Sequence, residues 1–281
     1  MTTTHTPAPD LSLRGKAAII TGSTQGLGAD IARVLSTCGA SVTIVGRNSQ
    51  QGQDLVKELT QQPENQAIYC QADIQQDEEI DHCIQATLDR FGRIDILVNN
   101  ACSYDDNGLD STREQWHRTL GVNLISAAIF AQKVLPHLKR GGVIINMGST
   151  GGKFGAQGRA IYPASKAAIL QFTRNLAVSA APQGVRAVTV SPAWTWSPAV
   201  QSQTGGSRAK ADKVGATFHP LGRVGDGAEI GNAVAFLCSD AASWITGVDI
   251  PVDGGFSILG PDQGISPRVW FPKLLGEQPD T

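Results

Sequence analysis

The sequence predicts an α/β fold in a single domain, built on a doubly wound, mostly parallel sheet. Short apolar runs alternate with longer helical patterns from residue 16 to residue 251. The runs are nearly continuous in Val and Ile, as in strands that are buried on both faces of a sheet. A glycine-rich turn joins the first run to the first helical pattern. Repeated β–α alternation of this kind requires crossover connections and therefore parallel strands.

The predicted strands are short, apolar and rich in β-branched residues, which favour extended backbone. They are Ala17–Thr21, Val42–Val45, Ala67–Gln71, Ile94–Asn99, Val143–Met147, Ala187–Ser191 and Val248–Val252. No internal repeat or linker divides the series, so we expect one domain over residues 13–257. Residues 1–12 are polar and are predicted to be a flexible segment. Residues 258–281 are rich in Pro and Gly and form a C-terminal extension.

Helical patterns fill most of the space between the runs. They are Gly28–Cys38, Asp77–Phe91, Thr112–Arg140, Ile161–Ala181 and Asp226–Ser239. Gly39 and Gly92 stand where a glycine commonly ends a helix. Pro136 is expected to bend or shorten the long third stretch, because proline removes a helical hydrogen bond. Residues 192–225 contain prolines, tryptophans and a Gly-Gly pair, and are predicted to form a loop.

Charge and cysteine content argue against several classes of protein. The 281 residues carry a net charge of −2, which argues against a nucleic-acid-binding surface. No uninterrupted apolar run reaches the roughly 18 residues of a membrane span, and the polar start lacks the pattern of a signal peptide. The five cysteines are scattered without C-x-x-C spacing, so we expect reduced thiols in a cytoplasmic protein. The five histidines show no ligand spacing, and no metal site is predicted.

The turn after the first strand has the glycine spacing of a phosphate-binding loop. It reads Thr21-Gly22-Ser23-Thr24-Gln25-Gly26-Leu27-Gly28. The first glycine allows a tight turn, the second lets the backbone approach a pyrophosphate, and the third permits close packing of helix on strand. The helix that follows would offer unpaired N–H groups to the anion. A plain glycine-rich connection is the alternative, but the strand–turn–helix context favours dinucleotide binding and a Rossmann-type sheet.

A second group of polar residues suits proton transfer. Tyr162 and Lys166 are four residues apart, so both side chains lie on one face of the predicted helix. A neighbouring ammonium favours an ionised phenol, which suits proton exchange with an alcohol or carbonyl oxygen. Ser149 follows the predicted strand Val143–Met147, where its hydroxyl can donate to the same oxygen. A surface helix pair is the alternative for the Tyr–Lys spacing alone.

With these motifs, the chain resembles the short-chain dehydrogenase/reductase family, in its single-domain form, over about residues 13–257. The matching motifs are Thr21–Gly28, Asp73-Ile74, Asn99-Asn100-Ala101, Asn123, Ser149, Tyr162-Pro163-Ala164-Ser165-Lys166 and Val252-Asp253-Gly254-Gly255. The glycine spacing is unlike that of the extended, epimerase-type branch, and the Tyr–Lys gap is unlike that of the enoyl-reductase branch. The resemblance implies an NAD(P)(H)-dependent oxidoreductase that interconverts a secondary alcohol and a ketone.

The resemblance also implies a role for each site residue. Tyr162 would be the general acid for carbonyl reduction and the base for alcohol oxidation, with Lys166 favouring its ionised form and binding the nicotinamide ribose. Ser149 would polarise the substrate oxygen, and Asn123 would hold a water that links Lys166 to solvent. Asp73 would contact the adenine. The expected cofactor contacts are Gly22, Ser23, Thr24, Gln25, Gly26, Leu27, Gly28, Arg47, Asp73, Ile74, Asn99, Ala101, Tyr162, Lys166, Pro192 and Ser197.

The chain departs from the family pattern at two positions that back the cofactor. Cys102 stands where the family usually has glycine after Asn-Asn-Ala, and is expected to be a packed thiol. Ala193 replaces the glycine that usually follows Pro192, which puts the local backbone in doubt. Trp194 and Trp196 follow the sixth predicted strand, where a doubly wound sheet opens its ligand crevice. Either they line the substrate pocket in the substrate loop 192–225, or they pack elsewhere.

The end of the second predicted strand favours NADP(H) over NAD(H). An acid at this position would hydrogen-bond the free 2′-hydroxyl of NAD and repel a 2′-phosphate. Here Gly46 leaves room and Arg47 follows, and a guanidinium can bind a phosphate through two parallel charge-assisted bonds. Gln25 stands where many phosphate-binding members of the family carry a second basic residue. NAD(H) therefore remains the alternative.

The expected partner is a small alcohol or ketone, with no nucleic acid and no membrane. The family is usually tetrameric or dimeric through long helices at the positions of Thr112–Arg140 and Ile161–Ala181. Small residues such as Ala127 and Ala167 permit close packing there, so we predict a homotetramer, with the extension 258–281 near a subunit contact or the mouth of the active site. Two other functions stay open: dehydration or isomerisation at the same site, and a non-catalytic nucleotide-sensing protein, which would be expected to lose the tyrosine or lysine.

Overall fold

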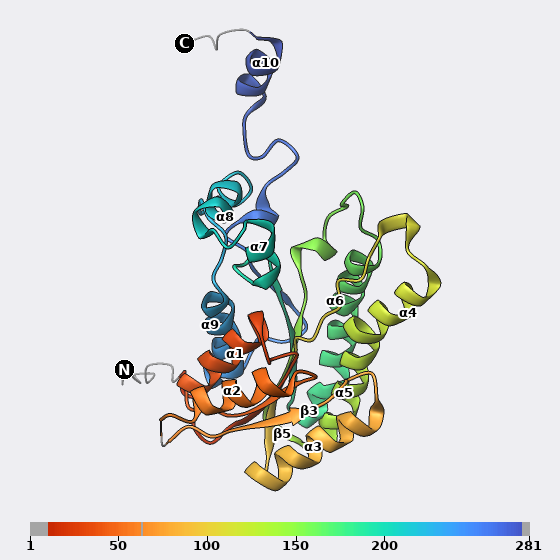
Figure 1. Cartoon of the computed structure of the whole chain (residues 1–281), viewed down its shortest axis with the longest axis vertical. Helices are drawn as coiled ribbons and strands as arrows, with labels where there is room; N and C mark the ends of the chain where they lie inside the picture. The colour runs from red at the N-terminus through yellow and green to blue at the C-terminus, as the bar shows by residue number, and fades with distance from the viewer. Residues whose placement is uncertain (1–10, 63, 277–281) are drawn as a thin grey trace, which may run out of the picture.

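The computed structural model describes residues 11–62 and 64–276, and its centre is one parallel sheet (Figure 1). Seven strands lie in the order β3-β2-β1-β4-β5-β6-β7. Their bounds are β1 Ala17–Thr21, β2 Ser41–Gly46, β3 Ala67–Gln71, β4 Ile94–Asn99, β5 Leu138–Met147, β6 Arg186–Pro192 and β7 Asp249–Val252. All seven predicted strands are confirmed, although β5 starts five residues earlier and β2, β6 and β7 differ from the predicted bounds by one residue at one or both ends. The order reverses between β1 and β4, and a crevice at the carboxyl ends of the strands is the usual ligand site at such a point.

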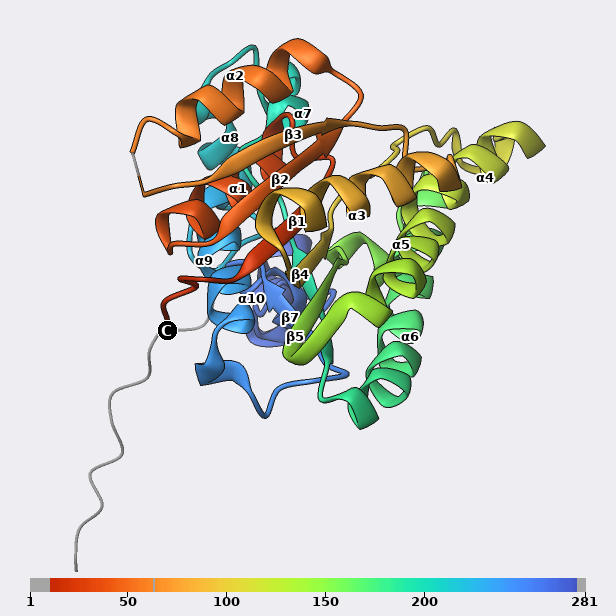
Figure 2. The same cartoon turned by 90° about the horizontal axis from the view of Figure 1, so that it is seen from below.

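Helices cover both faces of the sheet (Figure 2). One face carries α1 (Gly26–Thr37), α2 (Ser49–Leu59) and α9 (Gly227–Cys238), and the other carries α3 (Asp77–Phe91), α5 (Ser126–Val134) and α6 (Ile161–Ala180). Each face packs an apolar core of its own, and adjacent strand residues point to opposite faces. Ile20 therefore lies in the first core, under α1 and α9, while Ile19 lies with Phe130 in the second core, under α3, α5 and α6. Burial on both faces explains why the strands read as continuous apolar runs.

The prediction of one helix over Thr112–Arg140 is wrong. The segment contains α4 (Arg113–Leu120), a π-helical turn η2 (Gly121–Ile125), α5 and a 3₁₀ turn η3 (Leu135–His137), and β5 begins at Leu138. A capping box between Thr112 and Gln115 starts α4, and Pro136 within η3 ends the helical run, because it cannot donate a backbone hydrogen bond. By length and composition, Arg113–His137 could cross a membrane, a test that core helices also pass. Its Phe130 and Val134 are fully buried on the sheet.

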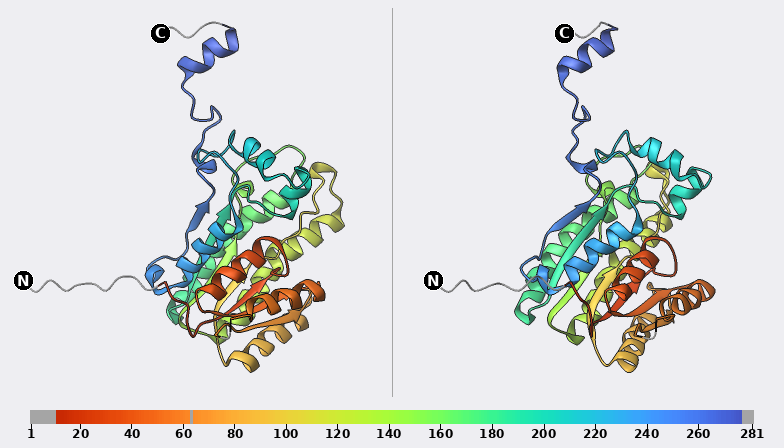
Figure 3. Two further views of the ribbon diagram at one scale, coloured as in Figure 1. Left: turned by 60° about the vertical axis from the view of Figure 1, so that its left-hand side comes forward. Right: turned by 90° about the vertical axis from the view of Figure 1, so that its left-hand side faces the viewer.

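Four helices were not predicted from the sequence. They are α2, α7 (Pro198–Gln203), α8 (Arg208–Gly215) and α10 (Pro267–Leu275). Side chains of Asn48, Ser207 and Ser266 accept hydrogen bonds from the first turns of α2, α8 and α10. The predicted loop 192–225 therefore contains two short helices. In both views of Figure 3, α10 stands away from the rest of the chain.

Burial changes close to residue 13, where the domain is predicted to start. Leu13 is fully buried, while Leu11 is half exposed; most of the predicted flexible segment 1–12 and the end of the extension lie outside the described residues. The remaining short turns are η1 Gly108–Asp110, η4 Thr150–Gly152, η5 Ala181–Gln183, η6 Asp240–Ala242 and η7 Phe256–Ile258. All five cysteines are free thiols, although the Sγ atoms of Cys70 and Cys83 lie 2.6 Å apart in the second core.

Candidate active site

The glycine turn between β1 and α1 has the tight geometry that its sequence predicts. Gly22 has a positive φ of 62°, and a Cβ at this position would lie 2.7 Å from Cα of Ala101. A side chain on Gly28 would collide with the carbonyl of Gly22 and the amide of Asn100. Asn100 in turn donates from Nδ2 to the carbonyl oxygens of Thr21 and Gly22, at 2.9 and 3.1 Å. The carboxyl ends of β1 and β4 are thereby locked together beneath the turn.

The N-terminus of α1 is free to receive an anion. Its N-cap residue Gln25 makes no side-chain hydrogen bond to the helix, and the first turn contains no acid. Unpaired N–H groups at such an end favour a phosphate. Ser23 cannot contribute its side chain, because its buried hydroxyl donates to the carbonyl of Ile20 (2.6 Å) and accepts from the N–H of Val45 (3.0 Å). The residues around the turn therefore fit a pyrophosphate through backbone donors, with Ser23 as a brace.

The residues predicted to contact the adenosine, Arg47, Asp73 and Ile74, follow the ends of β2 and β3. Arg47 directly follows β2, is exposed, and makes no ion pair within the part of the chain that the structure describes. Gly46 lies against Thr24, whose Cγ2 would be 2.7 Å from a Cβ at that position. After β3, Asp73 is half-buried and its Oδ1 accepts from the N–H of Gln75 at 3.1 Å, while Ile74 is buried.

Tyr162, Lys166 and Ser149 come together at the carboxyl end of β5. Tyr162 and Lys166 occupy the first turns of α6, with Nζ of Lys166 at 5.8 Å from the phenol ring. Lys166 is 4% exposed and donates to the carbonyl of Met147 at 2.7 Å. A Cβ on Gly151 would lie 3.2 Å from Cε1 of Tyr162 and 3.3 Å from Oγ of Ser149. The two hydroxyl-bearing side chains thus flank one glycine, which keeps the space between them open.

Asn123 is presented to this site by the π turn η2. Its Oδ1 accepts from the N–H of Ser103 at 2.7 Å, and its Nδ2 donates to the carbonyl of Ser103 and to Oγ of Ser165, both at 3.0 Å. Both amide hydrogens are therefore in use. The side chain therefore links the β4–α4 loop to α6 and has no amide hydrogen left for the predicted water.

Two residues of the β4–α4 loop contact Tyr162 and were missed by the sequence reasoning. The ring of Tyr104 stacks on that of Tyr162, with 5.1 Å between centroids. The carboxylate of Asp106 accepts from the N–H groups of Tyr162 (2.8 Å), Ala160 (3.0 Å) and Gly108 (2.9 Å). Burial alone would raise the pKa of Asp106, but these donors outweigh it and hold the pKa below its usual range. The β4–α4 loop therefore holds the start of α6 in place at Tyr162, the predicted acid/base residue.

The remaining predicted contacts lie along the same edge of the sheet. Asn99 is buried and donates from Nδ2 to the carbonyl of Ala127 (3.1 Å) and to Oδ1 of Asn146 (2.9 Å), so both of its amide hydrogens bind protein acceptors. Ala101 donates from its N–H to Oγ1 of Thr21 at 3.0 Å. Pro192 ends β6, and Ser197 is the N-cap of α7.

The departures from the family pattern are accommodated locally. Gln263 has the one positive φ among described residues other than glycine, so Ala193 adopts an ordinary backbone. Cys102 is half-buried; burial raises the pKa of its thiol, against the opposing effect of the nearby Lys166. Trp194 is 41% exposed. Among the described residues, no group of His, Cys, Asp or Glu side chains could hold a metal ion.

Comparison with known proteins gives consistent relatives. A family model described as Enoyl-(Acyl carrier protein) reductase matches residues 22–257. A 3-oxoacyl-(acyl-carrier-protein) reductase from Vibrio cholerae is 35% identical over 253 residues, covering 89% of this chain and 100% of the relative. An L-fucose dehydrogenase from Oryctolagus cuniculus is 35% identical over 265 residues, covering 92% and 89%. The solved structure of a 7 alpha-hydroxysteroid dehydrogenase complexed with NADH and 7-oxo glycochenodeoxycholic acid has a TM-score of 0.81 and 31% identity, covering 88% of this chain and 96% of that one.

Proposed function

Because the chain belongs to the short-chain dehydrogenase/reductase family of NAD(P)-dependent oxidoreductases, we propose that it interconverts a secondary alcohol and a ketone. The observation that carries this proposal is the placement of Tyr162 and Ser149 around Gly151, with the buried ammonium of Lys166 beside the phenol ring. All the polar groups needed to exchange one proton with a substrate oxygen lie at this point.

In the proposed mechanism the protein handles the proton and the cofactor handles the hydride. A bound nicotinamide would supply or accept the hydride. Ser149 and Tyr162 bind the substrate oxygen, and in ketone reduction Tyr162 gives it the phenolic proton. Lys166 stabilises the phenolate that remains, because a cation favours the charged form of a neighbouring acid. In alcohol oxidation the same atoms work in the opposite direction.

For the cofactor we propose NADP(H), with NAD(H) as the alternative. Support comes from Arg47, an exposed guanidinium without an ion pair among the described residues, at the end of β2. No carboxylate occupies the end of this strand to select a free 2′-hydroxyl. The backbone donors at the start of α1 would hold the pyrophosphate of either cofactor. We further propose that the protein is cytoplasmic, as its scattered free thiols suggest.

The test is an assay of the full chain with NADPH or NADH and a panel of ketones, followed at the nicotinamide absorbance band. Tyr162→Phe is expected to retain the fold and cofactor binding while turnover falls roughly 10²–10⁴-fold, because it loses the general acid. Tyr69→Phe is the matched control. It also removes one phenol, which donates to the carbonyl of Gly46 at 2.8 Å, and its turnover should stay near wild type. Near-normal turnover in Tyr162→Phe would contradict the assignment of Tyr162 as the general acid.

Two thioester probes separate the main alternative. The matched family model carries the description of an enoyl reductase, so C=C reduction is the second candidate. The four-residue Tyr–Lys step favours ketone reduction. Oxidation of NADPH by acetoacetyl-CoA, but not by crotonyl-CoA, is the expected result. Consumption of an unsaturated or hydroxylated substrate without any change in nicotinamide absorbance would instead indicate isomerisation or dehydration. Tight nucleotide binding without any turnover would indicate a nucleotide-sensing protein.

A further inference from the structure

A cavity of about 120 Å³ lies beside the candidate site, next to the carboxyl ends of β6 and β7. Its apolar wall comes from Trp194, Leu221, Ile230 and Val252. None of the residues assigned above to the cofactor or to proton transfer lines it. The volume is that of a small ring, since an engineered apolar cavity of about 150 Å³ holds benzene in another protein.

His219 lines this cavity and carries a buried polar atom without a partner among the described residues. The residue is 2% exposed, and both its backbone N–H (2.8 Å) and its Nδ1 (2.9 Å) lie at the carbonyl oxygen of Gly215. A carbonyl oxygen only accepts, so Nδ1 carries the proton and Nε2 of the neutral ring is an acceptor. Nε2 is buried and has no hydrogen-bond partner within residues 11–62 and 64–276. Leaving such a buried acceptor without a donor is unfavourable.

Gly254 lies against the side of the His219 ring that carries Cδ2. A Cβ on Gly254 would lie 3.6 Å from Cδ2 of His219, the carbon bonded to Nε2. Gly254 and His219 both line the cavity. A glycine at this position thus leaves room beside the Cβ–Cδ2 side of the ring, one bond away from the unpartnered Nε2.

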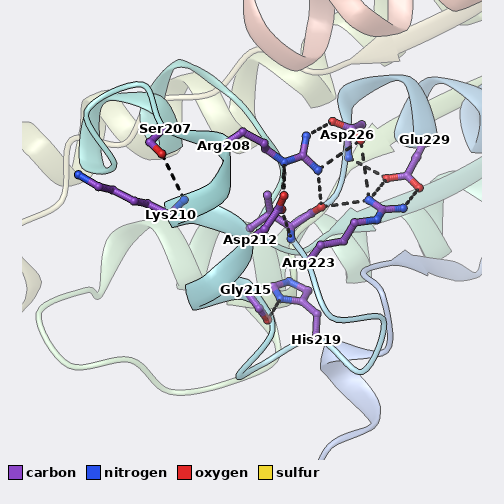
Figure 4. Close-up of polar contacts among 10 residues, drawn as sticks. Ser207, Arg208, Lys210, Asp212, Gly215, His219, Arg223, Asp226 and Glu229 are labelled. Carbon is purple, nitrogen blue, oxygen red and sulfur yellow. Dashed lines mark hydrogen bonds and ion pairs between the residues drawn. The ribbon is translucent and has the colours of Figure 1, made fainter.

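The charged groups at the cavity already have partners. Asp253 accepts from the N–H groups of Gly255 and Ser257, both at 2.9 Å, and the others pair with one another (Figure 4). Arg223 donates to Glu229 at 2.6 and 2.9 Å, and Glu229 accepts from the N–H of Asp226 at 2.8 Å. Arg208 lies against Asp226 and donates to Asp212 at 2.9 Å. These charges therefore offer little attraction to a further ion. What the cavity lacks is a neutral donor for Nε2.

Aromatic rings lead from His219 toward the loop of the candidate active site. The ring of His219 lies 5.7 Å from that of Trp194 and 5.3 Å from that of Phe256. Phe256 contacts Phe154 at 6.1 Å, and Phe154 lies in the loop that follows Ser149. A ligand that reached from Ser149 to His219 would meet an apolar, ring-lined surface on the way.

We propose that the cavity is a binding subsite for a hydroxyl-bearing, otherwise apolar group, held by a hydrogen bond from its hydroxyl to Nε2 of His219. The distal end of the substrate is one source of such a group. In that case the inference rests on the proposed function. A free small phenol or alcohol has the same chemistry and is the other source.

The kinetic arm compares two ketones that differ in one hydroxyl. The probes are 4-(4-hydroxyphenyl)butan-2-one and 4-phenylbutan-2-one, with the full chain and NADPH. The hydroxylated ketone is expected to have a kcat/KM about tenfold higher, the effect of one hydrogen bond to a buried acceptor. His219→Phe keeps the ring and removes both nitrogens. It should abolish this preference and leave kcat/KM for the parent ketone within about twofold of wild type.

The binding arm needs no turnover. Calorimetry with phenol and with toluene is expected to show binding of phenol alone, and both His219→Phe and His219→Asn should abolish it. His219→Asn retains an N–H for the carbonyl of Gly215 and removes Nε2, so the two variants separate the acceptor from the fold. Phenol that competes with the ketone places the subsite in the substrate pocket, whereas phenol that binds without competing is a separate ligand.

Two results would overturn the proposal. One is an absence of any preference in both arms, for the hydroxylated ketone and for phenol over toluene. The other is a preference that survives in folded His219→Phe and His219→Asn, as judged by thermal melting. If no ketone is reduced at all, the proposed function fails, and the calorimetry with phenol still decides whether the cavity binds a hydroxyl.

Discussion

At the scale of single residues, the sequence reveals those site residues that act through fixed spacing. Tyr162 and Lys166 are recognisable because four residues of helix bring two side chains onto one face. Asp106 could not be recognised in this way. It binds backbone N–H groups 54 and 56 positions further along the chain, and every residue except proline carries such a group. Only the folded β4–α4 loop reveals the contact.

Asp106 is expected to be a positioning residue for Tyr162. Asp106→Ala removes the acceptor for two N–H groups at the start of α6 and for one in its own loop. Losing a helix cap costs about 0.5–2 kcal/mol, so kcat should fall about tenfold while KM for the cofactor stays unchanged. Asp106→Asn keeps one oxygen acceptor and should recover most of the loss. Asp105→Ala is the control, because Asp105 pairs with Arg118 and Gln115 of α4. An equal loss in both alanine variants would contradict the role.

Arg47 is expected to select the cofactor. Arg47→Ala removes the guanidinium at the end of β2, and charge-assisted bonds to a phosphate contribute about 1.5–3 kcal/mol each. The dissociation constant for NADPH should therefore rise about tenfold or more, and that for NADH should hardly change. Fluorescence titration of both cofactors measures this, with exposed Arg113→Ala as a control of equal charge change. Equal effects on NADPH and NADH, or a wild-type preference for NADH, would remove Arg47 as the selector.

At the scale of elements, hydrophobic periodicity predicted the strands and helices that pack in the core and missed the short helices that local contacts stabilise. All seven strands and helices α1, α3, α6 and α9 were predicted because a buried face leaves a pattern in the sequence. Helices α2, α7, α8 and α10 are 6–11 residues long. Helices of this length are marginal alone and form through caps and tertiary contacts. The π turn η2 was missed because one extra residue disturbs a periodic pattern too little to be seen.

The link between α8 and α9 is expected to make folding stability depend on pH. The hydrogen bond from Arg223, aided by the N–H of Asp226, lowers the pKa of Glu229 from 4.5 to about 2. A folded-state pKa below the unfolded one gives a stabilisation that is complete above about pH 4.5 and is lost as the pH falls toward about 2. The side chains of Arg223 and Glu229 are 39% and 42% exposed. Because solvent screens such a pair, we expect its contribution to the free energy of unfolding to be about 1 kcal/mol or less.

Urea unfolding measures this contribution. Glu229→Gln should lower the free energy of unfolding at pH 7 and have progressively less effect between pH 4.5 and pH 2.5. Glu114→Gln is the control, since Glu114 also lies in the first turn of a helix, α4, and makes no ion pair with any described residue. A destabilisation by Glu229→Gln that is the same at pH 7 and pH 2.5 would show that the charge is not its cause.

At the scale of the whole molecule, two features support the proposed homotetramer. Ile125 and Val178, in the helical layer formed by α4, α5 and α6, are 55% and 76% exposed. Helix α10 exposes Phe271, Leu274 and Leu275, and a helix of nine residues is marginal in water without a surface to pack against. Of the two alanines expected at a subunit contact, Ala167 is exposed, whereas Ala127 is buried in the chain's own core.

Light scattering at micromolar concentration is expected to give four times the chain mass of 29.6 kDa. Val178→Glu should give smaller species, because it places a charge in the proposed contact. Val214→Glu on α8 introduces the same charge at a side chain that is 52% exposed, and should leave the mass unchanged. A wild-type mass equal to one chain would refute the assembly.

The π turn also limits where this chain can gain or lose residues during evolution. Each residue added to or removed from a helix rotates everything beyond it by about 100°. The π turn Gly121–Ile125 contains one residue more than an ordinary helical turn. Asn123 in this turn bonds to Ser103, and Phe130 in the helix that follows is fully buried on the sheet. Deleting one residue there would turn one of these two side chains away from its partner. The connection at 259–266 has no helical rotation to preserve. We therefore expect insertions and deletions to be tolerated there in descendants of this sequence and to be eliminated by selection in the π turn.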